Sequence, residues 1–192
     1  MDFSECVDVS RSTFAIFMEH FDKYCNVRYL TLDNMLPDLS TCIEELGLAF
    51  SSNKKCEVLS MRNNKIKSGP YGAFWLSMCG NHYLKKINVS KTDINDKVLA
   101  SLLEFLQEET TAVTELDISK NQITDVGLKT FALGLANNEI LSKLNMEGNH
   151  VRSEGCRFLA DFLCSNTALK WLSLGSNKIN NEGIMLFTYF LE

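Results

Sequence analysis

The chain has 192 residues, of which 45% are hydrophobic and 22% are charged, as is ordinary for a folded domain with one core. Its formal net charge is -5, and acidic and basic residues are interspersed along the whole length. Nucleic acid and anionic membranes attract a basic face, so the composition argues against both as partners. No run approaches the roughly 18 apolar residues that a membrane-spanning helix needs. Residues Met1 to Arg11 lack the basic start and apolar core of a secretory signal, so we expect a cytoplasmic protein.

The number and spacing of the cysteines also favour a cytoplasmic protein. There are seven of them, an odd count, and no two form a C-x-x-C pair. They are Cys6, Cys25, Cys42, Cys56, Cys79, Cys156 and Cys164. This usage favours reduced thiols that act as small core residues in an intracellular protein.

The N-terminal segment has the spacing of a helix. Thr13, Phe17 and Phe21 precede Val27 by 14, 10 and 6 residues. Three later residues precede Leu141 at the same offsets, namely Gly127, Phe131 and Leu135. The match predicts a helix that caps whatever structure begins at Val27.

From there to the end, one pattern occurs six times at steps of 28 or 29 residues. Its copies begin at Leu30, Leu59, Ile87, Leu116, Leu144 and Leu172. An apolar residue lies three positions before each of these, at Val27, Cys56, Leu84, Val113, Leu141 and Leu169. This second position was not used to find the repeat, so its regularity supports a true repeat.

Each unit joins two kinds of spacing. The first part alternates apolar and polar residues, as expected of a short strand, and the second part has helical spacing. One unit shows the helical spacing through Gly127, Leu128, Phe131, Ala132 and Leu135. A single unit cannot cover its own apolar stripe, so neighbouring units must stack. We therefore predict an α/β solenoid, a curved right-handed superhelix with parallel strands on the concave face and helices on the convex face.

An asparagine follows the strand in four of the six units. It is found at Asn64, Asn121, Asn149 and Asn177, and Thr92 takes its place in one unit. A side-chain amide both donates and accepts hydrogen bonds, so stacked asparagines can satisfy backbone groups where the strand bends into the loop. We expect Thr92 to do this less fully.

The pattern L-x-x-L-x-L-x-x-N-x-I, with a glycine six residues after the asparagine, resembles the ribonuclease-inhibitor-like leucine-rich repeats. It is clearest in residues 141–155 and 169–183. The resemblance implies about six such repeats in residues 27–192, preceded by a capping helix or half repeat in residues 1–26. The class includes ribonuclease inhibitor, the sensing ends of NOD-like receptors, the Ran GTPase-activating protein and tropomodulin-like actin caps. Such proteins hold a protein partner on the concave strand face or on the loops at its rim.

Alternation along the strands predicts which side chains face a partner. In residues 115–119, Leu116 and Ile118 should be buried, while Glu115, Asp117 and Ser119 should point to the open face. Stacking turns such positions into columns. The first column reads Tyr29, Val58, Lys86, Glu115, Lys143 and Trp171. The second column reads Thr31, Ser60, Asn88, Asp117, Asn145 and Ser173. The third column reads Asp33, Arg62, Ser90, Ser119, Glu147 and Gly175.

Trp171, flanked by Lys143 and Glu147, is the candidate binding anchor, because exposed aromatic residues dominate the energetics of interfaces. In the alternative interpretation, Lys86, Glu115 and Lys143 neutralise one another across strands and Lys143 stacks on Trp171. The predicted partner-binding residues are Trp171, Lys143, Glu147, Glu115, Asp117, Lys86, Arg62 and Tyr29.

Motifs for chemistry are missing from the sequence. It contains no phosphate-binding P-loop, no G-x-S-x-G elbow and no H-E-x-x-H helix. Cys79 and His82 have a metal-like spacing, yet two ligands do not make a zinc site. Cys156 lies early in a predicted helix, but Leu128 and Ile184 hold the equivalent place, which favours packing. We expect no catalytic residue, no metal, no cofactor and no small-molecule substrate.

These observations predict a non-enzymatic module for recognition between proteins. One alternative is a GTPase-activating protein of the Ran type, in which Arg62 or Lys91 would be the working group. Another is a sensing or regulatory fragment of a larger receptor or of a bacterial effector. Its motivation is that Glu192 falls inside the last predicted helix, so the chain could be truncated at its C-terminus.

Overall fold

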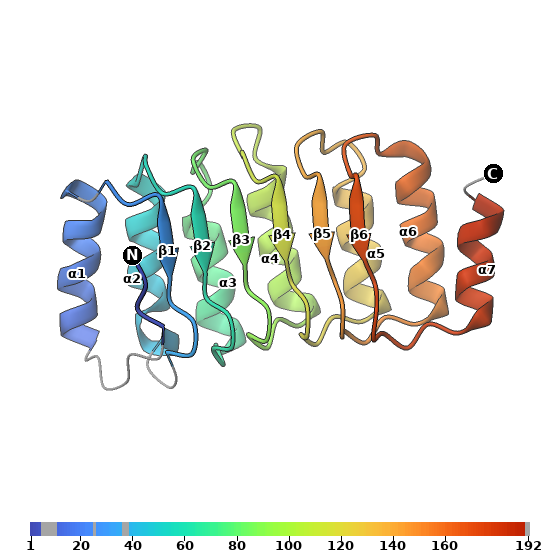
Figure 1. Ribbon diagram of the computed structural model, residues 1–192, viewed down its shortest axis with the longest axis horizontal. Coiled ribbons are helices and arrows are strands. Elements are labelled where there is room, and N and C mark those ends of the chain that lie inside the picture. The colour runs from blue at the N-terminus through green and yellow to red at the C-terminus, as the bar shows by residue number, and fades with distance from the viewer. Residues whose placement is uncertain (5–10, 25, 36–38, 191–192) are drawn as a thin grey trace.

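The computed structural model describes residues 1–4, 11–24, 26–35 and 39–190. Helices and strands alternate along it. In chain order they are α1 (Arg11–Tyr24), β1 (Tyr29–Thr31), α2 (Leu39–Ser52), β2 (Val58–Ser60), α3 (Ser68–Ser77), β3 (Lys86–Asn88), α4 (Asp96–Gln107), β4 (Glu115–Asp117), α5 (Asp125–Gly134), β5 (Lys143–Asn145), α6 (Ser153–Ser165), β6 (Trp171–Ser173) and α7 (Asn181–Phe190). Figure 1 shows the strands side by side in one layer and the helices in a second layer.

The six strands form one parallel sheet in the order of the sequence, from β1 to β6. Their register pairs the residues that the repeat made equivalent: Leu116 lies opposite Ile87 on one side and Leu144 on the other. Parallel neighbours require a crossover between them, and each crossover here contains one helix. The predicted α/β solenoid is confirmed.

The core lies between the sheet and the helices. The central residue of each strand from β1 to β5 is buried, while its two neighbours are exposed or half-buried. The largest buried side chains come from α3, where Trp75 packs edge-on against Phe74 with ring centroids 4.7 Å apart. Trp75 also reaches Phe105 of α4, at 5.9 Å. Aromatic burial of this kind joins neighbouring units into one continuous core.

At the N-terminal end the first residues of the chain extend the sheet. The backbone N–H of Phe3 donates to the carbonyl of Thr31 at 2.8 Å, and the N–H of Thr31 donates to the carbonyl of Met1 at 3.1 Å. Helix α1 packs on α2, with the Phe21 ring 5.5 Å from that of Phe50. The free edge of β1 is therefore covered.

The C-terminal end of the described chain is more open. Leu172, Leu174 and Ile179 are half-buried, whereas the equivalent residues one unit earlier are fully buried. Ile184 and Met185 on α7 are exposed. Leu191, which the repeat placed in the last helix, lies outside the described residues. No helix in the described part of the chain is long and apolar enough to cross a membrane.

Asn64, Asn121, Asn149 and Asn177 form an asparagine ladder at the ends of the strands. The Asn121 amide donates to the carbonyls of Val89 and Ile118, both at 3.0 Å. Its oxygen accepts from the N–H groups of Thr92 and Ile94, at 2.9 and 3.0 Å. Asn64, Asn149 and Asn177 likewise donate to a carbonyl of the preceding unit, and each accepts from one backbone N–H of that unit.

Thr92 interrupts the asparagine ladder, as the sequence predicted. Its hydroxyl donates to the carbonyl of Val89 at 2.7 Å and lies 3.1 Å from the hydroxyl of Tyr71. Burial raises the pKa of Tyr71 well above its usual range. In this unit the hydroxyls of Thr92 and Tyr71 together occupy the place that a single asparagine side chain fills in other units.

The glycine of the repeat leaves room for a link between helices. Asp96 in α4 accepts hydrogen bonds from the N–H and the hydroxyl of Thr124, at 2.8 and 2.6 Å, just before α5 begins. A β-carbon on Gly127 would lie 2.2 Å from the Asp96 oxygen that accepts from the Thr124 N–H. The next unit repeats the arrangement with Asp125 and Gly155. Only glycine allows the carboxylate this close to the next helix.

Candidate functional site

A row of charges crosses the open face of the sheet on the first residues of β3, β4 and β5. One oxygen of Glu115 lies 3.0 Å from the Lys86 ammonium and 3.3 Å from the Lys143 ammonium. The pKa of Glu115 is lowered, chiefly by the hydrogen bond from Lys86 and then by the one from Lys143. Burial of the carboxylate opposes this shift. The cross-strand ion pairs expected from the sequence are present.

Trp171 comes next in this column, on β6, and half of its surface is exposed. The stacking of Lys143 on Trp171, which the alternative interpretation proposed, is not found among the described contacts. Lys143 instead directs its ammonium to Glu115 on the other side. In the described part of the chain the cation found over a ring is Lys129, 5.4 Å from the centre of Phe158. Within the described residues, the indole is thus left without a cation over its face.

A hollow of about 570 Å³ lies over the strands and ends at Trp171. Five of the eight predicted residues line it: Lys86, Glu115, Asp117, Lys143 and Trp171. Four further lining residues, which the sequence placed in the same columns without selecting them, are Val58, Ser60, Asn88 and Asn145. Their position in the columns was the sequence feature that could have identified them, because small and amide side chains carry little chemistry of their own.

The second row of polar side chains is tied into the sheet. Asp117 accepts a hydrogen bond from the Asn145 amide at 3.1 Å and another from the N–H of Ser119 at 2.9 Å. The second of these closes a tight turn between a side chain and the backbone two residues on. Asn88 and Asn145 make the same turn with the residues that follow them. These groups therefore have fixed orientations on the open face.

The expectation that Ser119 points to the open face is wrong. Ser119 is buried, as are Ser90 and Asp33 in the same column. The reason is that β4 ends at Asp117, and the chain has already begun to turn, with a positive φ of 55° at Lys120. The predicted alternation thus holds through Ile118, which is buried as expected, and fails at Ser119.

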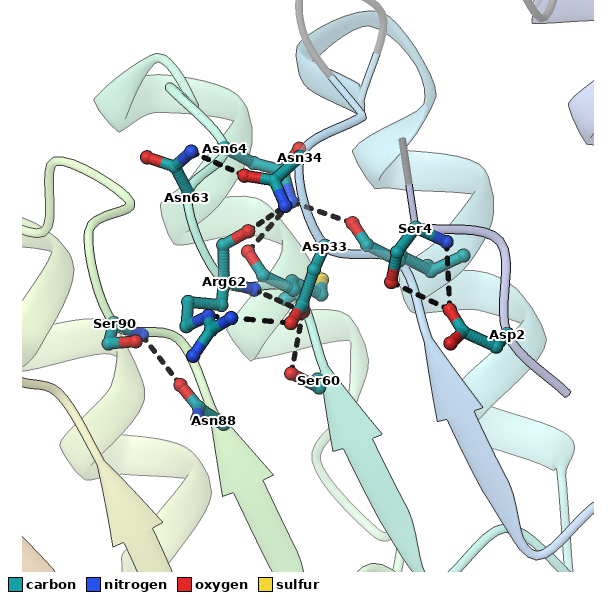
Figure 2. Close-up of polar contacts among 12 residues, drawn as sticks. Asp2, Ser4, Asp33, Asn34, Ser60, Arg62, Asn63, Asn64, Asn88 and Ser90 are labelled. Carbon is teal, nitrogen blue, oxygen red and sulfur yellow. Dashed lines mark hydrogen bonds and ion pairs between the residues drawn. The ribbon is translucent and has the colours of Figure 1, made fainter. Parts of the chain in front are cut away.

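The remaining predicted residues lie outside the hollow. Figure 2 shows Arg62 beside Asp33, whose carboxylate accepts from the Ser60 hydroxyl at 2.6 Å and from the Arg62 N–H at 2.8 Å. The Arg62 guanidinium lies 3.5 Å from that carboxylate. Glu147 faces Lys120 at 3.9 Å. Tyr29 is exposed at the opposite end of the first column from Trp171.

Cys42, Cys56 and Cys156 are buried packing residues, whereas Cys164 is exposed, contrary to the expectation that it is a core residue. Burial raises the pKa of Cys56 to about 11. Burial and then the charge of Asp125 raise the pKa of Cys156 to about 11 as well. A thiol with such a pKa is a poor nucleophile at neutral pH. Cys6 and Cys25 lie outside the described residues, and within them no group of three His, Cys, Asp or Glu side chains could hold a metal ion.

Comparison with known proteins agrees with the repeat and the fold. A family model described as leucine rich repeat matches residues 111–132, 137–160 and 165–187. A leiomodin-1 structure, described as actin-binding site 2, is 21% identical, with 77% of this chain and 86% of that chain covered and a TM-score of 0.64. The C-terminal domain of a Caenorhabditis elegans tropomodulin is 14% identical, with coverages of 80% and 91% and a TM-score of 0.63. No curated protein matches the sequence.

The tandem matches show leucine-rich repeats within residues 111–187, and the six stacked strand–helix units have the architecture of a leucine-rich-repeat solenoid. The two structural likenesses extend over most of both chains and show that the fold is shared.

Proposed function

We propose that the open strand face binds a protein partner, with Trp171 as the central contact. The observation that carries this proposal is the half-exposed indole at the end of a hollow whose lining combines apolar side chains, among them Val58 and Leu116, with charged and polar ones. Tryptophan is enriched among the residues that contribute most to protein interfaces. Burying an exposed indole against a partner removes a large apolar area from water.

The charge row beside Trp171 favours a partner with complementary charge. Lys86 and Lys143 share the single carboxylate of Glu115, so each ammonium can still bond another acceptor. Partner carboxylates placed over these lysines would form additional ion pairs at the edge of the buried indole. Such pairs affect the association rate and specificity more than the total affinity.

The structural likeness to leiomodin-1 suggests one purified protein to test. That structure is described as an actin-binding site, so actin is a concrete candidate. At 21% identity the likeness concerns the fold, and no residue of the open face here is assigned to actin by it. A capture experiment with cytosolic extract should therefore accompany a direct assay with actin.

The test compares three forms of the chain as bait: the parent, Trp171→Ala and Leu133→Ala. Leu133 is an exposed apolar residue on α5, on the helical side, and is the matched control. We expect the parent and Leu133→Ala to retain the same partner, identified by mass spectrometry, and Trp171→Ala to lose it. Circular dichroism checks that all three are folded. Equal capture by all three would overturn the assignment to Trp171.

A further inference from the structure

A second hollow, of about 350 Å³, lies where the first strands begin, and it is markedly basic. Its charged lining among the described residues is Arg28, Lys54, Lys55, Lys85 and Glu57. Four cations therefore surround one carboxylate, in a chain whose formal net charge is -5. A local excess of positive charge on an acidic protein favours an anionic ligand at that place.

The positive charge of this basic hollow is only partly neutralised. Glu57 lies 3.1 Å from the Lys85 ammonium and 3.9 Å from the Arg28 guanidinium, so two cations share it. Lys55 donates to the side-chain oxygen of Asn26, a neutral group. Over the described residues, neither Lys54 nor Lys55 forms an ion pair, and both are exposed. Two ammonium groups are thus available for an incoming anion.

The same edge of the solenoid changes sign a few units further on. A hollow of about 440 Å³ there is lined by Glu108, Glu109 and Glu139, with no cation among its described lining residues. By repeat position Glu139 is the equivalent of Lys54. An extended polyanion lying along the edge would meet these carboxylates, and like charges repel strongly. The edge therefore suits a short anionic segment better than a nucleic acid or an anionic membrane surface.

We infer that the basic hollow binds a short segment rich in aspartate and glutamate on a protein partner. The inference rests on the proposed function only in taking the partner to be a protein. The basic hollow and the hollow at Trp171 share no lining residue. The two surfaces can therefore be tested separately.

The test measures the anisotropy of a short oligoglutamate peptide that carries an uncharged dye, titrated with the full chain. An oligoglutamine peptide of the same length is the control ligand. We expect the glutamate peptide to bind, its affinity to fall with added salt, and Lys54→Glu/Lys55→Glu to weaken binding on the order of tenfold or more. Lys170→Glu should bind like the parent, because Lys170 has the repeat position of Lys85 but lies outside the basic hollow.

Three results would overturn the inference. They are equal binding of the two peptides, unchanged binding by Lys54→Glu/Lys55→Glu, and tighter binding of phosphatidylserine vesicles through the same lysines. Trp171→Ala should leave peptide affinity unchanged. Failure of the peptide assay therefore leaves the role of Trp171 standing, and failure of the capture experiment leaves the basic hollow standing.

Discussion

At the scale of single residues, asparagine side chains hydrogen-bond much of the backbone before and after the strands. A second set of asparagines, which the sequence analysis did not single out, precedes the strands at Asn53, Asn81, Asn138 and Asn166. Each accepts from the N–H groups two and three residues on, and donates to a carbonyl of the preceding unit. Both sets satisfy backbone groups that no strand or helix pairs.

Asn121→Ala should lower the free energy of unfolding by about 2 to 4 kcal/mol. The change leaves the buried N–H groups of Thr92 and Ile94 without their acceptor, and each unsatisfied buried group is costly. Chemical denaturation followed by circular dichroism measures the effect. Asn137→Ala is the control, because Asn137 is exposed and its side chain makes no hydrogen bond among the described contacts. Equal stability of the two variants would refute the role of the asparagine ladder.

Glu115 should make stability depend on pH. Its pKa in the folded chain lies below the ordinary value of about 4.3, chiefly because Lys86 and then Lys143 bond the carboxylate. A lowered folded pKa means that the stabilisation is complete above the ordinary value and is lost as the pH falls through the folded value. The denaturation midpoint of the parent minus that of Glu115→Gln should therefore shrink as the medium is acidified below about pH 4.

The control for the pH experiment is the denaturation midpoint of the parent minus that of Glu109→Gln. Glu109 is exposed and has no ion pair among the described residues. A difference between the parent and Glu115→Gln that stays constant with pH would show that the charge row does not stabilise the fold.

At the scale of elements, the starts of α5 and α6 each depend on the previous helix. Asp96 and Asp125 reach across to the first residues of the following helix, and glycines at the start of that helix make room for them. This gives a physical reason for the glycine six residues after the asparagine. The sequence showed the glycine as part of the pattern, whereas the carboxylate that needs it lies in the preceding unit.

Gly127→Ala should therefore destabilise the chain by about 1 to 3 kcal/mol, because the new methyl group displaces Asp96 from its hydrogen bonds to Thr124. Gly69→Ala is the matched change in α3, where a β-carbon would meet nothing within 4 Å. It should change stability by less than about 1 kcal/mol, since the gain from alanine in a helix is opposed by Pro70, which disfavours helical backbone in a preceding residue that carries a β-carbon. Thermal denaturation measures the stability of both variants, and an equal loss of stability in both would contradict the explanation.

At the scale of the whole molecule, the repeat step was enough to predict the fold. Steps of 28 or 29 residues gave the strand register and the first column of the open face, because equivalent residues of stacked units must lie side by side. The burial of Ser119 was missed, since the length of a strand is decided by where the chain turns. The basic hollow was missed for another reason: Arg28 and Lys85 share a repeat position two residues before the leading strand residue, outside the columns that were compared, and Lys54 lies in the loop before β2.

The central claim, that a partner covers the indole of Trp171, can be tested directly by fluorescence. The chain has two tryptophans, and Trp75 is fully buried with an indole N–H that has no hydrogen-bond partner among the described residues. Trp75→Phe removes that donor and leaves Trp171 as the single reporter. Addition of the captured partner should shift its emission to shorter wavelength and protect it from acrylamide. A partner that binds, as shown by calorimetry, while emission and quenching stay unchanged would contradict the account.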